Sequence, residues 1–244
     1  INYLRKNFIN LGWLNNVCVK EDDVLHNVEE NIKLVEKLIG KVIPGIPLLE
    51  FPLNTNDEQS ANEFLKNYEI SPGKLIIGFH PGCATLKNHI KRRWEPEKFA
   101  ELGAKLIKEK NAKVLIFGGP EEDELKKEIH KKINSENAII VKTNSLAETA
   151  AVMKRCNVFV TNDSSLMHVA SALKLNVVAI IGPTNTNYIR PWKTNHKIVS
   201  LNLDCAPYFV YSPKHLICSR KDVQFKCIKE LSTDMVYEAV VKFI

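Results

Sequence analysis

The sequence of 244 residues contains no run of about 18 apolar residues, so no segment has the length and hydrophobicity of a membrane-spanning helix. The first ten residues carry Arg5 and Lys6 but no apolar stretch followed by small residues, and we do not expect a signal peptide there. The chain begins with Ile1 instead of methionine, in the middle of a pattern. We therefore expect further residues upstream.

Several motifs of common enzyme classes are also missing. The sequence has neither a G-x-x-x-x-G-K-[ST] loop nor a G-x-G-x-x-G turn, which argues against ATP hydrolysis and standard dinucleotide oxidoreduction. It has no G-x-S-x-G elbow, which argues against a serine hydrolase of that class. We expect no cofactor.

The cysteine pattern does not predict a metal site. None of the six cysteines forms a C-x-x-C pair, and the spacing of Cys205, Cys218 and Cys227 fits no common zinc pattern. Reduced thiols in a cytoplasmic protein are the favoured interpretation. A metal or a disulfide among these last three cysteines is the less favoured alternative.

The composition is that of a globular protein, with 45% hydrophobic and 25% charged residues. The net charge of +6 suits an anionic partner such as a phosphorylated small molecule, an acidic lipid surface or nucleic acid. Aromatic residues are not interleaved with basic ones as single-strand binding requires, so we expect no nucleic acid partner.

The chain changes character after its first quarter. Apolar residues recur at helical spacing over 26–39, and the following stretch, 42–54, holds three prolines and a glycine and reads as a connector. We predict three parts: residues 1–56 as the end of an N-terminal domain with its linker, 57–230 as a Rossmann-like domain, and 231–244 as a C-terminal helix.

From residue 75 onward, short apolar strands alternate with amphipathic helices. The expected strands are 75–79, 114–117, 138–141, 158–160 and 177–181, and the expected helices are 96–110, 121–133, 146–155, 164–173 and 232–244. Short helix candidates such as 57–67 precede them. This alternation predicts an α/β fold with a doubly wound parallel sheet covered on both faces.

Polar residues and glycines follow the predicted strands. His80 follows the first strand and Gly118 the second, while Asp163, Ser164 and Ser165 follow the fourth, and Gly182 and Thr184 the fifth. The carboxyl ends of the strands in such a sheet border one crevice, where glycines let backbone N–H groups and helix starts approach an anion. The sequence therefore predicts a phosphate or nucleotide site.

Each of these residues also has a purely structural interpretation. Gly118 can belong to a tight turn, Asp163 or Ser164 can cap the next helix, and His168 can be a core residue. Glu148, three residues after Ser145, fits a capping box, and Lys91 fits a solvated basic loop.

Four ordered segments resemble one family. They are FHPGCATLKNHIKRRWEPEKFAEL (79–102), VLIFGGPEEDE (114–124), SLAETAAVMKRCNVFVTND (145–163) and NDSSLMHVASALKLNVVAIIGPT (162–184). The last is similar to an Asp-[Ser/Thr]-Gly-x-x-His-x-Ala-x-Ala signature followed by a strand and Gly-Pro-Thr. The chain thus resembles glycosyltransferase family 9, the ADP-heptose:lipopolysaccharide heptosyltransferases, over residues 75–244.

The resemblance implies a GT-B fold, in which two Rossmann-like domains face each other. It also implies inverting, metal-independent transfer of heptose or a related sugar to a lipid-linked saccharide acceptor. The donor would be a nucleotide sugar, ADP-heptose by analogy. It gives Arg92 the stabilisation of the leaving diphosphate. The implied donor-binding residues are Asp163, Ser164, Ser165, His168, Thr184, Gly182, Glu148, Gly118, His80 and Lys91.

Three departures from the family pattern stand out. Ser165 replaces a glycine, Glu95 separates Trp94 from Pro96, and most of the family's first domain has no counterpart in this sequence. That domain supplies the acceptor cleft and the acidic general base, so no general base is assigned here. On this chain we expect donor binding.

Two other functions remain as alternatives: a nucleotide-sugar-binding module without catalysis, and a UDP-sugar epimerase of the GT-B type. The basic loop and the family's lipid-linked acceptor also imply a cytoplasmic protein in peripheral contact with the anionic inner face of the cytoplasmic membrane.

Overall fold

The computed structural model describes residues 2–3, 15–209 and 215–244, which form two compact units. The first unit consists of residues 1–48 and 185–190. It contains the parallel strand pair β1 (Asn2–Tyr3) and β2 (Cys18–Val19) and the helix α1 (Asn27–Ile39), which confirms the helix predicted at 26–39. α1 begins where His26 Nδ1 accepts the Val28 N–H, and it ends at Gly40, whose φ of 68° is left-handed.

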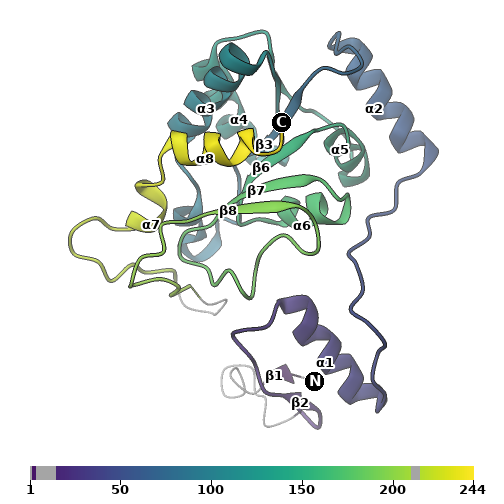
Figure 1. Cartoon of the computed structure of the whole chain (residues 1–244), viewed down its shortest axis with the longest axis vertical. Coiled ribbons are helices and arrows are strands. Elements are labelled where there is room, and N and C mark those ends of the chain that lie inside the picture. Colours follow the sequence, from purple (N-terminus) through teal and green to yellow (C-terminus); the bar gives the residue numbers. More distant parts are fainter. Residues whose placement is uncertain (1, 4–14, 210–214) are drawn as a thin grey trace. The chain divides into compact units, whose positions relative to one another are not determined.

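The second unit, residues 49–184 and 191–244, is built on a six-stranded parallel sheet (Figure 1). Its strands are β3 (Ile76–His80), β4 (Lys113–Ile116), β5 (Ala138–Ile140), β6 (Val158–Asn162), β7 (Asn176–Ile180) and β8 (His196–Val199). Five of them match the predicted strands to within two residues. The doubly wound parallel sheet is confirmed.

The spatial order of the strands is β5-β4-β3-β6-β7-β8, and every neighbouring pair is parallel. The chain winds outward from β3 through β4 to β5, then returns to β6 beside β3 and winds the other way. β3 and β6 are therefore the switch point, where the connections leave in opposite directions and ligands bind in sheets of this kind.

Helices cover the sheet in two sets. α3 (Pro96–Lys110) packs against α4 (Asp123–Ile133) and α8 (Thr233–Val241), while α2 (Thr55–Asn67) packs against α5 (Leu146–Met153), which contacts α6 (Ser165–Ala172). α3 shows why the sequence folds this way, because Pro96 occupies its first turn and the Phe99, Leu102 and Leu106 side chains are fully buried.

The elements that the sequence did not predict are short or lie at an edge. They are the two-residue strands β1 and β2, the 3₁₀ helices η3 (Leu86–Arg92) and η4 (Pro120–Glu122), the single-turn helix α7 (Lys226–Lys229) and the edge strand β8. Too few residues take part in each for a hydrophobic period to show. η3 turns the predicted basic loop back toward the sheet.

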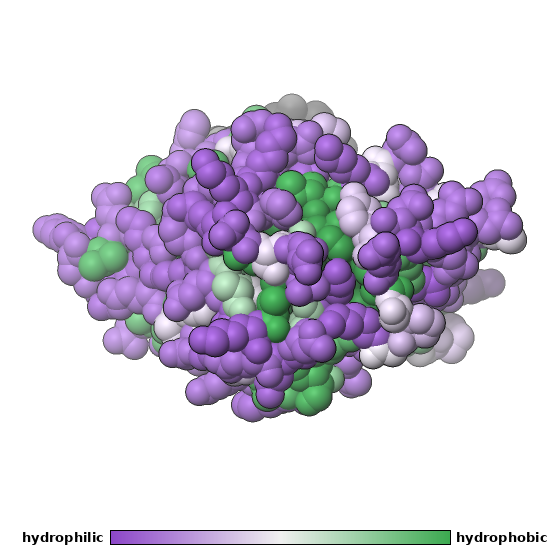
Figure 2. Space-filling view, turned by 90° about the horizontal axis from the view of Figure 1, so that it is seen from above, coloured by the Kyte–Doolittle hydropathy of each residue, from purple (hydrophilic) through white to green (hydrophobic). Residues whose placement is uncertain are grey.

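The surface and the thiols are unremarkable. On the face seen in Figure 2, hydrophilic residues cover most of the surface and hydrophobic ones show in small separate areas. Over the described residues, no helix combines the length and the apolar character needed to cross a bilayer. All six cysteines are free thiols, and no three His, Cys, Asp or Glu side chains in the described ranges are grouped to hold a metal ion.

Candidate functional site

A cavity of about 840 Å³ opens at the carboxyl ends of the strands, next to the switch point. Its walls come from the segments that follow β3, β4, β5 and β6. Of the predicted site residues, it brings together His80, Arg92, Gly118, Asp163, Ser164, Ser165 and His168. This volume suits a ligand of the size of a small cofactor or nucleotide.

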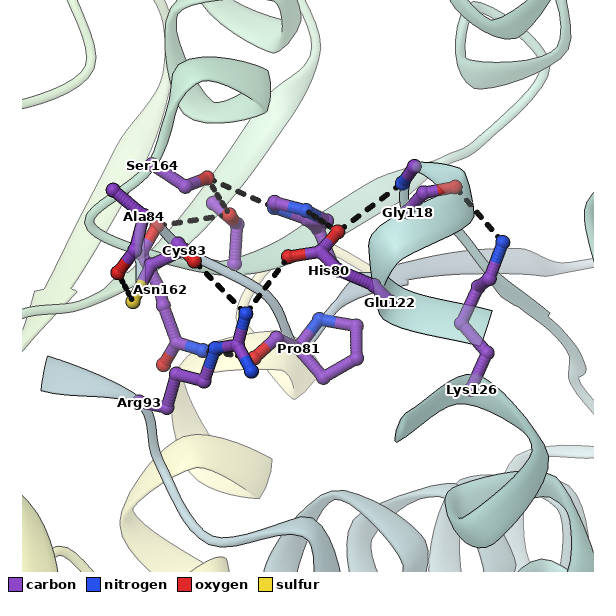
Figure 3. A network of polar contacts seen from close by, with 12 residues as sticks. His80, Pro81, Cys83, Ala84, Arg93, Gly118, Glu122, Lys126, Asn162 and Ser164 are labelled. Carbon is purple, nitrogen blue, oxygen red and sulfur yellow. Dashed lines mark hydrogen bonds and ion pairs between the residues drawn. The ribbon is translucent and has the colours of Figure 1, made fainter. Parts of the chain in front are cut away.

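His80 spans the switch point. It ends β3 and is 4% exposed, and its two ring nitrogens contact residues from two other strand ends. Nδ1 lies 2.9 Å from the Ser164 hydroxyl oxygen, and Nε2 lies 3.1 Å from Oε2 of Glu122 (Figure 3). The histidine thereby joins the loop after β4 to the loop after β6.

Glu122 accepts hydrogen bonds from three groups of this network. Its buried carboxylate receives His80 Nε2, Arg93 NH2 at 3.2 Å and the backbone N–H of Gly119 at 3.2 Å. Burial by itself would raise the pKa of Glu122, but the contacts with His80, Arg93 and Gly119 outweigh it and lower the pKa. Glu122 is therefore an ionised, buried carboxylate at neutral pH.

Two glycines make room for that carboxylate. A Cβ at Gly82 would lie 1.6 Å from Glu122 Oε1, and one at Gly118 would lie 2.7 Å from Oε2. A side chain at either position would have to displace this carboxylate from the contacts that hold it. At Gly118 this packing role stands beside the predicted approach of backbone to ligand.

A second group of contacts fixes the loop between β3 and α3. Asn162 Nδ2 donates to the Pro81 carbonyl at 2.7 Å, and Asn162 Oδ1 accepts the Trp94 N–H at 3.0 Å. Arg93 NH2 donates to the Cys83 carbonyl at 2.9 Å. Burial raises the pKa of the Cys83 thiol, so this thiol at the cavity wall stays protonated.

Arg92 and Asp163 form a buried ion pair beside the cavity. Arg92 NH1 lies 2.5 Å from Asp163 Oδ2, the same oxygen accepts the Thr184 hydroxyl at 2.7 Å, and the guanidinium lies 4.6 Å from the centre of the Phe209 ring. The Arg92 and Asp163 side chains are 2% and 4% exposed. The pair is expensive to break because either charge alone would be left buried.

The start of α6 forms the part of the cavity wall that suits an anion. Ser164 is the N-cap residue, but its hydroxyl makes no capping hydrogen bond to the helix and instead contacts His80 and, at 3.1 Å, Thr161. Ser165 is exposed at the first helical position. Burial lowers the pKa of His168, with Asp163 opposing the effect, so its imidazole is neutral at pH 7.

The remaining predicted residues lie outside the lining of the cavity. Thr184 is buried behind Asp163, and Gly182 packs against the Cys227 and Ile228 side chains. Glu148 accepts the Asn144 N–H at 2.8 Å at the start of α5, and Lys91 is exposed. Any role of these four residues toward a ligand stays a prediction.

Sequence reasoning missed Glu122, the burial of Arg92 and the partial burial of Arg93. Arg93 and Arg92 belong to a basic run that resembles a solvated loop, yet both bind buried carboxylates. A signal was present, since Glu122, the second acid of Gly-Gly-Pro-Glu-Glu, follows a strand end just as His80 does. Nothing in the sequence showed that Glu122 and His80 would be in contact.

Together, the sheet and the cavity define an α/β protein of the Rossmann type with a ligand-sized site at its switch point. The chain belongs to glycosyltransferase family 9 (heptosyltransferase), whose model matches residues 4–216. This confirms the family to which the sequence motifs pointed.

Known relatives support this membership. The chain is 31% identical over 181 residues to a lipooligosaccharide heptosyltransferase 2 of Campylobacter jejuni, which covers 70% of this chain and 52% of the relative. This chain thus spans about half the length of the curated relatives it matches.

Solved structures show the same fold. The structure of E. coli ADP-heptose LPS heptosyltransferase II matches with a TM-score of 0.70 and 19% identity over 99% of this chain and 68% of that one. An E. coli heptosyltransferase solved with ADP matches with a TM-score of 0.59 and 19% identity over 94% and 60%. These likenesses confirm the GT-B-type prediction for the sheet described here.

Proposed function

We propose that this chain forms the donor-binding part of an inverting glycosyltransferase that transfers heptose, or a related sugar, from ADP-heptose to an acceptor of the lipopolysaccharide-core type. The observation that carries the proposal is the cavity at the switch point, lined by His80, Asp163 and the start of α6. Family membership, curated heptosyltransferase relatives and a related fold solved with ADP support it.

The diphosphate would lie against the first backbone N–H groups of α6. Unpaired amides and the helix dipole stabilise negative charge at such a position. The chain of contacts from His80 to Ser164 leaves the Ser164 hydroxyl outside the helix cap, so it does not compete for these amides. The neutral imidazole of His168, one turn further along α6, would face the sugar.

Arg92 would act on the leaving group from within its ion pair. Its guanidinium borders the cavity and is held by Asp163 and the Phe209 ring, and Thr184 donates to the same Asp163 oxygen. A positive charge that is already oriented needs little reorganisation when negative charge develops on the departing diphosphate. No general base is assigned among the described residues.

Calorimetric titration of this chain with ADP, ADP-heptose and UDP tests the donor assignment. We expect both adenine ligands to bind and UDP to bind more weakly. Equal or tighter binding of UDP would favour the epimerase alternative. Incubation of the complete gene product with ADP-heptose and a heptose-deficient lipopolysaccharide then tests transfer, and binding without transfer would favour a non-catalytic module.

The lipid-linked acceptor would place the protein in the cytoplasm, at the inner face of the cytoplasmic membrane. The basic run offers Lys87 and Lys91 to such a surface, since both are exposed, but not Arg92 or Arg93, whose charges are held by buried carboxylates. Replacing Lys87 and Lys91 with Gln should weaken binding to anionic liposomes, and unchanged binding would count against this contact.

A further inference from the structure

The serine at the start of α6 behaves unlike the other serine N-caps of this chain. Ser145 of α5 accepts the Glu148 N–H at 3.1 Å, and Ser232 of α8 accepts the Met235 N–H at 3.3 Å. Ser164 has the same extended backbone, with φ −152° and ψ 170° against −146° and 163° at Ser145, yet its hydroxyl caps nothing. The φ and ψ angles therefore do not explain the difference. The backbone hydrogen bonds do differ, because the Met167 N–H at the third position of α6 donates to the Ser164 carbonyl at 3.2 Å, whereas the Glu148 N–H at that position of α5 donates to the Ser145 hydroxyl.

Two side chains hold the Ser164 hydroxyl instead. His80 Nδ1 lies 2.9 Å and the Thr161 hydroxyl 3.1 Å from Ser164 Oγ, which turns that hydroxyl toward β3 and β6 and away from the amides of α6. His80 cannot rotate toward another partner because Nε2 contacts Glu122, and Glu122 is itself held by Arg93 and by the Gly119 N–H (Figure 3).

The tautomer follows from the same contacts. The ionised Glu122 accepts only, so Nε2 of His80 carries a proton. In the neutral ring, Nδ1 is then an acceptor and takes the Ser164 O–H; in a protonated ring, Nδ1–H donates to Ser164 Oγ. In both cases the Ser164 hydroxyl is engaged with His80. The other charged or titratable groups of the cavity wall are Cys83, Arg92, Glu121, Asp163 and His168, and Arg93 contacts Glu122 from outside the lining.

We infer that His80, held by Glu122, keeps the N-terminus of α6 open for a diphosphate by drawing the Ser164 hydroxyl away from the helix amides. This inference rests on the proposed function. It makes His80 and Glu122 positioning residues that act through Ser164, and it makes the Ser164 hydroxyl a potential competitor of the ligand. Once released from His80, that hydroxyl would turn to the start of α6 and compete with the diphosphate for the first-turn amides that the bond from the Met167 N–H to the Ser164 carbonyl leaves open.

A pair of substitutions separates this role from ordinary ligand contact. His80→Phe preserves a planar ring but removes both nitrogens, and we expect ADP affinity to fall about fivefold, the size of effect expected when one serine cap competes for the site. Adding Ser164→Ala to His80→Phe removes the competitor, so affinity should recover about fivefold. If the Ser164 hydroxyl were a ligand, the second substitution would weaken binding further or leave it weak, and the inference would be wrong.

Ser145→Ala provides the matched control. It removes a serine N-cap that lines the same cavity but that no histidine holds, so in the His80→Phe background it should restore nothing. Recovery with Ser145→Ala as well would attribute the effect to general loosening and overturn the inference. If His80→Phe does not fold, as judged by its thermal unfolding, His80→Leu with and without Ser164→Ala gives the same test, because it also removes both ring nitrogens.

Hydrogen exchange separates failure of this inference from failure of the proposed donor. In His80→Phe without any nucleotide, the first-turn amides of α6 should become more protected as Ser164 caps them. If wild-type protein does not bind ADP but this protection appears, the donor assignment fails and the inference stands. If ADP binds and protection stays unchanged, only the inference fails.

Discussion

Ser145 and Ser164 stand at the starts of two helices, α5 and α6, that border the same cavity. Their backbones are alike, and both precede helices of eight residues. Ser145 closes its helix by accepting the Glu148 N–H, whereas Ser164 is engaged with His80 and leaves its helix uncapped. The comparison teaches that one residue type in one conformation can seal a helix end or leave it open, depending on a partner distant in sequence.

The largest loss of stability is expected when the residue next to Ser164 is replaced. Asp163, next to Ser164, neutralises buried Arg92, so Asp163→Ala should cost about 3–5 kcal/mol of unfolding free energy. Chemical denaturation measures this loss. The fold will thus not persist unchanged, and weakened ADP binding in Asp163→Ala would not by itself show a ligand contact.

A more conservative change keeps that measurement interpretable. Asp163→Asn retains an acceptor for the Thr184 hydroxyl and removes only the charge. We expect it to be less destabilising than Asp163→Ala, and ADP binding should be compared in this variant. Equal stability of both variants and wild type would contradict the cost assigned to the ion pair.

The second prediction concerns Glu122, which holds the histidine that contacts Ser164; no histidine contacts Ser145 of α5 in the described structure. Because its pKa is lowered in the folded protein, it contributes stability that is present above the ordinary glutamate pKa of about 4.3 and is lost as pH falls through the folded value. Glu122→Gln should therefore cost about 2 kcal/mol at pH 7, as expected for hydrogen bonds to a charged group.

The pH dependence identifies the cause. Chemical denaturation at pH 7 and at successively lower pH measures the difference in unfolding free energy between wild type and Glu122→Gln. This difference should become smaller below pH ~4.3. If this difference in unfolding free energy does not depend on pH, the shape of the Glu122 side chain and not its charge stabilises the protein.

The fold could be predicted from the sequence because the buried strands and helices have a clear period. β8 was missed since His196 and Lys197 face partly outward at the sheet edge and interrupt the apolar pattern. The sequence left Asp163 or Ser164 as the cap of this helix; Ser164 occupies the N-cap position, but its side chain does not cap the helix. The competing contact with His80 spans 84 residues, and no local pattern encodes it.

Glu122 illustrates the same limit in the site. A glutamate at a helix start usually lies in solvent and interacts with the helix dipole. Its burial here depends on Gly82, 40 positions away, whose missing side chain leaves the space that the carboxylate fills. The predicted strand ends located the crevice, but the contacts between those ends decide which residues line it and which support it.

The third prediction removes the closed cap. Ser145→Ala should destabilise the protein by about 1 kcal/mol, because the Glu148 N–H loses its acceptor. Thermal unfolding measures the change. ADP affinity should remain within about twofold of wild type, since 1 kcal/mol of helix stability does not alter the α6 end. Loss of affinity without loss of stability would show that the two helix starts are not independent.

The smallest effect is expected at Glu148, for which the sequence offered two roles, a cap or a contact with the donor. Its carboxylate accepts the Asn144 N–H at 2.8 Å and lies outside the lining of the cavity. Glu148→Gln keeps the shape and removes the charge at the α5 N-terminus, so stability should fall by about 0.3–0.5 kcal/mol. Calorimetry with ADP decides between the roles. Unchanged affinity would leave Glu148 as part of the closed helix start, whereas a loss of fivefold or more would show that the bound donor draws it from Asn144, just as His80 draws Ser164 from α6.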